Sequence, residues 1–232
     1  MTAPNAPDPA LPKIWFTRFM SETDSIQNLD FQIDYPPEID AAILLKQQIE
    51  FIDASVGMRP IDQSRWSTFL FFNKGLKIRE NTADAFRIHN GLMIVSPRLR
   101  DVMAQFDLGT SQLIEVPIYK SEKKKDPSRY PPHYVLHVTE KKSAFVPEAS
   151  EHVKPIGPHA DTPQHPDTLW KRDIRGEDVP ALRATAVNGA DMWGDPKYKR
   201  RIFFSDRLKC AIDEAKIKTQ GLKFFPATDV PD

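Results

Sequence analysis

The most constraining feature of the sequence is a strand–helix–strand pattern that occurs twice, at residues 94–117 and at residues 203–226. In the first copy, Ser96 suits a helix N-cap, and Pro97 suits the first helical position because its missing N–H needs no partner there. A glycine then ends the helix, and an alternating segment predicts a second strand. One apolar helix face is indicated by the spacing of Leu99, Val102, Met103 and Phe106.

The two copies share identities as well as periodicity when the sequence is shifted by 109 positions. Polar positions coincide as well as apolar ones, so we interpret the pattern as an internal duplication. The alternative is coincidence, because a serine N-cap followed by an amphipathic helix is common. The matching pairs are Ser96/Ser205, Arg98/Arg207, Leu99/Leu208, Met103/Ile212, Leu108/Ile217, Thr110/Thr219, Leu113/Leu222 and Pro117/Pro226.

A more specific pattern closes the second copy: an apolar residue, Ser, an acidic residue, Leu and Lys lead into a helix, which Gly-Leu-x-Phe follows. It consists of Phe204, Ser205, Asp206, Leu208, Lys209, Gly221, Leu222 and Phe224. With this pattern, the chain resembles immunity family eleven of bacterial polymorphic toxin systems over roughly residues 86–226. The apolar strand at Tyr134–Leu136 also fits, whereas the family's Asn near His137 is missing.

The resemblance implies a non-catalytic immunity protein that binds and neutralises a cognate toxin. Such toxins are often delivered by contact-dependent systems such as type VI secretion. Two alternatives remain open: a nucleic-acid-binding module, and an enzyme with an unrecognised metal site. No phosphate loop, dinucleotide fingerprint, nucleophile elbow or paired-carboxylate motif is visible, so we expect no catalytic residues and no cofactor.

The expected fold class is α+β, with a mostly antiparallel sheet packed on one side by three main helices at residues 38–54, 97–107 and 206–215. We expect one compact unit with a disordered lead-in at 1–12, an N-terminal α+β part at 13–85 and the immunity-family core at 86–232. Expected strands include 14–20, 31–33, 66–72, 113–116, 133–139 and 201–204, whereas residues 148–167 are expected to form a long loop.

Charge is distributed unevenly although the whole chain is neutral. Between Met1 and Gln63 there are ten acidic and four basic residues. This asymmetry predicts either a solvated acidic face or a surface that steers a basic toxin. The candidate partner-binding residues are Asp30, Asp34, Glu38, Asp40 and Asp53.

The histidines give no metal motif. His133 and His137 lie four apart in an expected strand, where that spacing separates them by about 13 Å. A second group combines His152, His159 and His165 with Asp161 and Asp167, but its irregular, proline-rich spacing favours a polar surface loop over a metal site.

The remaining candidates also favour a plain binding protein. Cys210, the single cysteine, has no sequence neighbour that would activate it, and it fits a reducing cytosol. The basic runs are expected to be solvated, without a nucleic-acid partner; they consist of Lys123–Lys125 and of Lys197, Lys199, Arg200 and Arg201. No secretory leader and no membrane-spanning apolar run is visible, so we expect a cytoplasmic protein.

Overall fold

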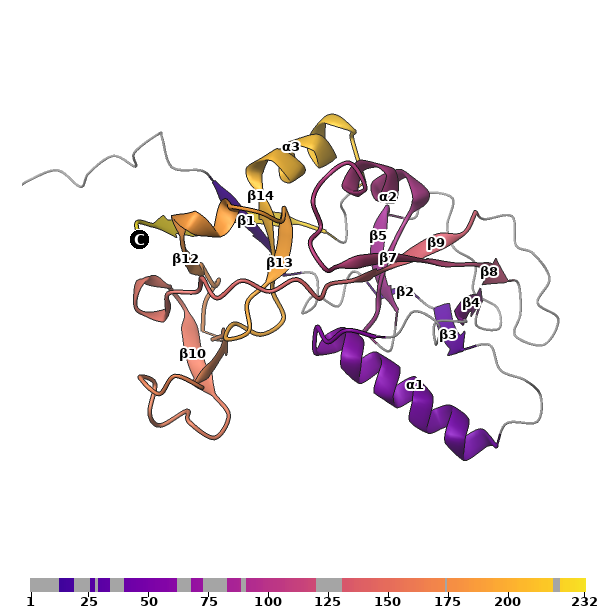
Figure 1. The fold of residues 1–232 in the computed structure, drawn as a ribbon, viewed down its shortest axis with the longest axis horizontal. Coiled ribbons are helices and arrows are strands. Elements are labelled where there is room, and N and C mark those ends of the chain that lie inside the picture. The colour runs from indigo at the N-terminus through magenta and orange to yellow at the C-terminus, as the bar shows by residue number, and fades with distance from the viewer. Residues whose placement is uncertain are drawn as a thin grey trace, which may run out of the picture.

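The computed structural model describes residues 13–18, 26–27, 29–33, 40–61, 68–72, 83–88, 91–119, 131–173, 175–218 and 222–232. They form an α+β fold in which two similar halves meet at a pair of helices (Figure 1).

The first half is a five-stranded sheet in the order β2-β5-β6-β9-β7. All of its pairings are antiparallel except that of β2 with β5. Helix α2, Pro97–Met103, connects β6 to β7, and β9 returns between these two strands. The strands are β2 (Ile26–Gln27), β5 (Ala85–Ile88), β6 (Met93–Val95), β7 (Gln112–Val116) and β9 (His133–His137).

The second half repeats this arrangement in an antiparallel sheet of order β13-β14-β1-β15. Helix α3, Asp206–Glu214, connects β14 to β15 as α2 connects β6 to β7. The inserted strand, however, is the N-terminal β1 rather than a strand that follows β15. The strands are β1 (Ile14–Thr17), β13 (Met192–Gly194), β14 (Ile202–Ser205) and β15 (Phe224–Pro226).

The two helices begin with the same cap. Ser96 Oγ accepts a hydrogen bond from Leu99 N at 3.2 Å, and Ser205 Oγ accepts one from Leu208 N at 3.3 Å. Each cap hydroxyl also donates to an aspartate. The Ser96 hydroxyl lies 2.6 Å from Asp84 Oδ1. The Ser205 hydroxyl lies 2.5 Å from Asp191 Oδ1. The two serines therefore have matching surroundings, as the duplication predicts.

The aspartates also connect each half to the other. Asp84 Oδ2 accepts from the backbone N–H of Lys218, just beyond α3, at 2.7 Å. Asp191 Oδ2 accepts from the backbone N–H of Asp107, just beyond α2, at 3.1 Å. Each carboxylate thus accepts a hydrogen bond from the N-cap serine of the helix in its own half and another from the chain that leaves the opposite helix.

The basic residue of each cap motif covers an aromatic ring of the inserted strand. The guanidinium of Arg100 lies 4.7 Å from the ring centroid of Tyr134 in β9. The ammonium of Lys209 lies 4.3 Å from the ring centroid of Trp15 in β1. Trp15 in addition donates from Nε1 to Asp206 at 2.7 Å. The matching contacts explain why Arg or Lys stands at this place in both copies.

One hydrophobic core joins the halves. It includes Leu99 and Met103 of α2 together with Leu208 and Ile212 of α3, all fully buried. A second core lies in the first half around Phe86, and a third lies in the second half around Trp193 and Phe203. Burial of side chains of this size stabilises the fold by on the order of 2 kcal/mol per residue.

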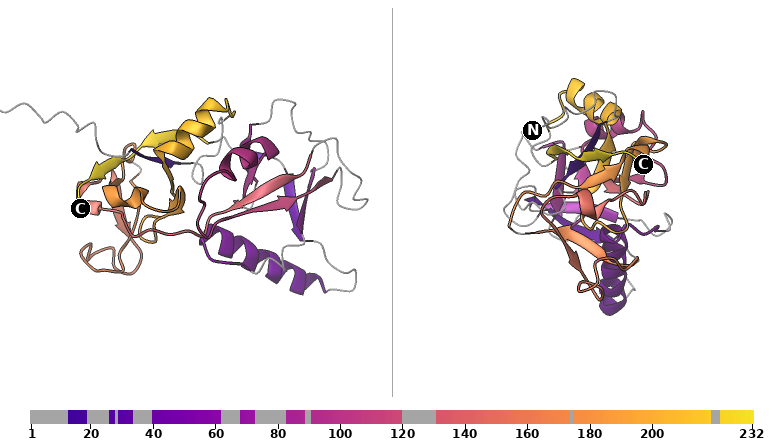
Figure 2. Two further views of the ribbon diagram at one scale, coloured as in Figure 1. Left: turned by 45° about the horizontal axis from the view of Figure 1, so that its top comes forward. Right: turned by 90° about the vertical axis from the view of Figure 1, so that its left-hand side faces the viewer.

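The third helix, α1, takes no part in the joint. It spans Ala41–Val56 and begins at the N-cap Asp40. Figures 1 and 2 show α2 and α3 side by side, with α1 on the far side of the first sheet. The expectation of three helices on one side of one sheet is therefore corrected to two helices at the centre of two sheets and one helix outside.

The second correction concerns the register of the repeat. α3 has nine residues and α2 has seven, so equivalent positions beyond the helices are offset by two more residues. In the sheets, Glu115 pairs with Tyr134, and Pro226 pairs with Trp15. The pairs Leu113/Leu222 and Pro117/Pro226 are therefore not structural equivalents, although Ser96/Ser205 to Met103/Ile212 are.

The remaining strands form three small sheets. A strand was missed in the segment expected to be a loop, because Pro155 argues against a strand interior; here the pair β10-β11 leaves it an edge position. The other sheets are β3-β4-β8 and the parallel pair β12-β16. The bounds are β3 (Leu29–Ile33), β4 (Thr68–Phe72), β8 (Ile118–Tyr119), β10 (Val153–Ile156), β11 (Leu169–Arg172), β12 (Ala181–Arg183) and β16 (Thr228–Val230).

The first prediction tests the cap that joins the halves. Ser205→Ala removes the helix cap and one donor to the fully buried Asp191, so we expect a loss of about 2 kcal/mol in the free energy of unfolding. Ser96→Ala should cost less because Asp84 is slightly more exposed. Urea denaturation measures both, with the exposed Ser143→Ala as a control that should change nothing. Equal stability of Ser205→Ala and the unsubstituted chain would contradict the role of the cap.

The second prediction concerns the pH dependence of stability. Burial raises the pKa of Asp229 in β16 to about 6, against a weaker opposing hydrogen bond with the Ile14 backbone. The folded chain thus retains this proton more tightly than the unfolded chain, and its stabilising contribution is lost as pH rises from about 4 to about 6. Asp229→Asn should therefore raise the urea midpoint near neutral pH and leave it unchanged near pH 4. If the urea midpoints of Asp229→Asn and the unsubstituted chain differ by the same amount at both pH values, the prediction is contradicted.

Candidate partner-binding surface

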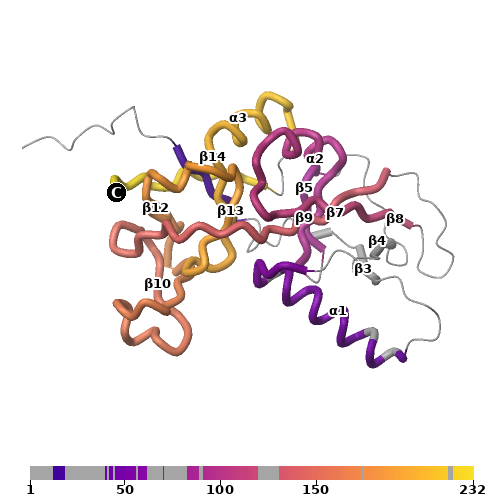
Figure 3. The backbone as a smooth tube through the Cα atoms, viewed as in Figure 1, coloured from indigo at the N-terminus to yellow at the C-terminus, as the bar shows by residue number. Residues whose placement is uncertain are grey.

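The large hydrophobic side chains that are exposed in the described part of the chain all lie on α1. They are Ile43, Leu45 and Ile49, with exposed fractions of 52%, 57% and 49%. The helix is anchored instead through Phe51 and Ser55, which are both buried. Figure 3 shows α1 running along the outside of the first half. Leu45 and Ile49 share one side of the helix, whereas Ile43 lies on another side, and the rest of the chain leaves all three accessible.

The spacing of these residues explains the exposure. Leu45, Ile49 and the partly buried Ile52 follow one another at i, i+4 and i+7, on one side of the helix. Phe51 and Ser55 lie on an adjoining side, which faces the protein. The helix expected at 38–54 was predicted to pack on the sheet, whereas Ala42, Ile43, Leu45 and Ile49 of α1 are exposed. The apolar residues of this segment spread too widely around the helix to be buried by a single contact, and this spread is the sequence signal that could have predicted the exposure.

The predicted acidic residues lie partly on the same helix. Asp40 is the exposed N-cap of α1, and its side chain accepts from Ala42 N at 2.7 Å. Asp53 is exposed in the last turns of α1. Asp30 lies in β3, and Asp34 and Glu38 lie outside the described residues. The structure therefore brings Asp40 and Asp53 to the helix that also carries the exposed apolar residues.

A buried group of charges in the second half is structural. Asp178 is fully buried and accepts hydrogen bonds from Arg18 at 3.0 Å, Arg201 at 2.8 Å and Tyr198 at 2.5 Å. Burial alone would raise the pKa of Asp178, but the bonds and charges of these partners outweigh it and lower the pKa. Because Arg18 follows β1 directly, the group fixes the N-terminal strand to the second half.

The second basic run does not lie wholly at the surface. Arg201 points inward to Asp178, whereas Lys197, Lys199 and Arg200 are exposed. Lys123–Lys125 lie outside the described residues. The tertiary structure therefore removes one charge from the candidate nucleic-acid surface.

Cys210 has no nucleophile-like setting. It is exposed on α3, and the pKa of its thiol is raised by partial desolvation and by the carboxylate of Asp206. A reactive cysteine has the opposite property, a lowered pKa.

His133 and His137 are buried in β9, and burial lowers the pKa of both rings.

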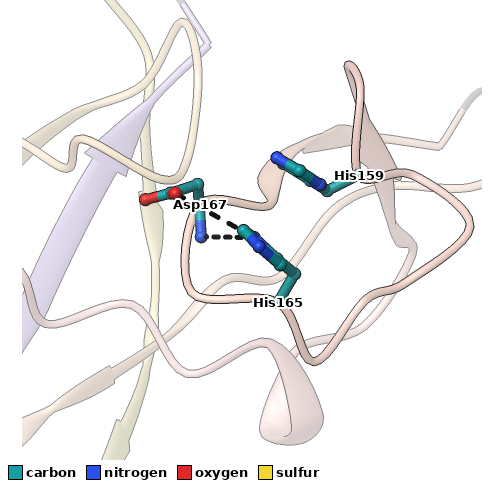
Figure 4. Close-up of side chains that lie close together, drawn as sticks. All are labelled: His159, His165 and Asp167. Atoms are coloured by element: carbon teal, nitrogen blue, oxygen red, sulfur yellow. Dashed lines mark hydrogen bonds and ion pairs between the residues drawn. The ribbon is translucent and has the colours of Figure 1, made fainter.

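The proline-rich histidine segment is brought together more closely than its spacing suggested. His159, His165 and Asp167 offer ligand atoms that all lie within 4.8 Å of one another (Figure 4). His152 and Asp161 are exposed and do not belong to this group. Among the described residues, this is the one cluster of at least three potential metal ligands.

Comparison with known proteins identifies the family of the chain. The helices in the described part of the chain are all too short or too polar to cross a bilayer. No curated protein matches the sequence. The model of the immunity protein family Imm11 matches residues 19–229, which is nearly the whole chain, including α1 and both halves of the duplication. The chain therefore belongs to the immunity protein family Imm11.

Proposed function

We propose that this chain is an immunity protein that binds and neutralises a cognate toxin in the cytoplasm, and that the exposed side of α1 lies at the centre of the binding surface. Membership of the immunity family supports the function. The concentration of exposed Ile43, Leu45 and Ile49 on one helix is the observation that supports the place. Large exposed apolar groups rimmed by polar residues are typical of protein-binding surfaces.

The dimensions of α1 suit this role. A helix of 16 residues is about 24 Å long. It can therefore run across much of a standard interface, which buries about 1,600 Å² in total. The proposed action requires no catalysis, because a rigid partner that covers an active site or a substrate path already blocks the toxin.

Charge would contribute to the rate of association. Asp40, Glu50 and Asp53 are exposed on or beside the same helix, against two exposed cations, Lys46 and Arg59. A basic toxin, such as a nuclease, would be attracted to this excess of carboxylates. We accordingly assign the predicted acidic residues a role in steering, and the apolar residues the larger share of affinity.

The third prediction tests the apolar surface. Leu45→Glu combined with Ile49→Glu should weaken binding of the toxin domain encoded beside this chain by about tenfold or more, because buried apolar anchors dominate interface energy. Glutamate maintains helix propensity, and exposed substitutions change stability little. Titration calorimetry measures the dissociation constant, with Ser143→Glu as the matched control in the second half.

The possible outcomes distinguish an error in the proposed function from an error in the proposed location of the binding surface. Unchanged affinity in the folded double variant would move the binding surface away from α1. Absence of any complex between the unsubstituted chain and the toxin domain, or undiminished toxicity when both are produced together, would overturn the function itself.

The fourth prediction tests steering. Asp40→Asn combined with Asp53→Asn removes two charges, and asparagine preserves the helix cap. We expect slower association at low salt and an effect that disappears at high salt, measured by stopped-flow fluorescence. Glu148→Gln with Glu151→Gln removes the same charge from exposed sites in the second half. A rate constant that is equally low in both double variants would contradict a local role for α1.

A further inference from the structure

The loop between β10 and β11 has a defined backbone. Successive turns are closed by hydrogen bonds from Ala160 N to Gly157 O, from Thr162 N to His159 O and from His165 N to Thr162 O, at 2.9–3.1 Å. The buried Thr168 then donates its hydroxyl to Thr162 O at 3.0 Å. These bonds hold the segment that carries the histidines in one shape.

This shape places two imidazoles and a carboxylate together. The rings of His159 and His165 are stacked, with centroids 3.7 Å apart and an interplanar angle of 13°. Asp167 Oδ2 lies 4.0 Å from His165 Nδ1. Figure 4 marks contacts between His165 and Asp167 and none from the ring of His159 to either residue. Each of the three side chains offers one ligand atom to a cation.

We propose that His159, His165 and Asp167 form a binding site for a borderline divalent cation of the zinc class. Neutral imidazole nitrogens and a carboxylate oxygen are ligands that zinc prefers, and three protein ligands leave a fourth position for water. Bonds of about 2.0–2.2 Å require ligand atoms closer than about 4.4 Å. The ligand atoms lie within 4.8 Å of one another, so they must approach further when an ion binds.

Binding turns one ring. A metal ion lies in the plane of each imidazole that coordinates it, so two parallel rings cannot both hold the same ion. The lone pair of His165 Nδ1 accepts a hydrogen bond from the backbone N–H of Asp167 at 3.2 Å, so coordination through this nitrogen replaces that bond. The half-exposed His159 has no such bond and is the ring that turns. Occupancy of the site therefore unstacks the two histidines and closes the loop further.

The site is separate from the proposed toxin-binding surface. The loop extends from the second half, whereas α1 lies along the first half, and the views agree that the two are apart (Figures 1 and 2). The cation would stabilise the loop between β10 and β11. We assign it this structural role and no reaction.

Cobalt(II) is the probe that tests the fifth prediction. Titration of the tag-free full chain with Co²⁺ should give the intense visible absorption of a tetrahedral site, saturating at one equivalent, and Zn²⁺ should displace it. His159→Ala and His165→Ala should each raise the dissociation constant by about 100-fold, and Asp167→Asn should raise it by about tenfold. Even changes to residues that only contact the metal ligands lower metal affinity by about 10–100-fold. Asp161→Asn and His152→Ala are the matched controls and should bind as the unsubstituted chain does.

Two further measurements protect the test. Thermal melting of the metal-free variants should match the unsubstituted chain, because the three side chains lie at the surface. Histidine side-chain NMR should show the His159 ring leaving its stacked environment on addition of Zn²⁺. Absence of the cobalt absorption at one equivalent, or undiminished affinity in both histidine variants, would overturn the proposal.

Discussion

Two buried carboxylates hold this protein together. Asp84 and Asp191 each accept from the serine that caps the helix of their own half and from a backbone N–H beyond the helix of the other half. A buried charge is costly unless hydrogen bonds replace its water, and here the replacement comes from both halves. Neither half satisfies its aspartate alone, so these hydrogen bonds couple the two halves of the duplication.

The duplication is also permuted at one strand. In the first half β9 follows β7 and inserts between β6 and β7, whereas in the second half the N-terminal β1 fills the equivalent place. The aromatic residue under the basic cap position is Tyr134 in one case and Trp15 in the other. The start of the described chain is therefore central to the sheet that the end of the chain completes, and Arg18 secures it to Asp178.

This frame fixes which surfaces remain for binding. Helices α2 and α3 pack against each other where the halves meet, and their apolar residues lie in the shared core. α1 has no counterpart at the joint, so its apolar residues outside the contact through Phe51 stay exposed. Under the proposed function, the joined halves supply the rigid support and α1 supplies the binding surface, so the two requirements fall on different elements. The histidine loop projects from the second half and leaves the frame unchanged.

The sequence alone predicted the family, the α+β class, the two capped helices and about half of the strands that the structure describes. These depend on neighbours close in the chain: a serine hydroxyl reaches an N–H three residues on, and apolar spacing reveals a helix face. The structure decided what depends on distant partners. It placed β1 in the second sheet, shifted the repeat by two residues after the helices, left Ile43, Leu45 and Ile49 in solvent, turned Arg201 inward and stacked His159 on His165. Local hydrogen bonds can be read from local sequence, whereas burial and side-chain proximity depend on which remote segment packs against each surface.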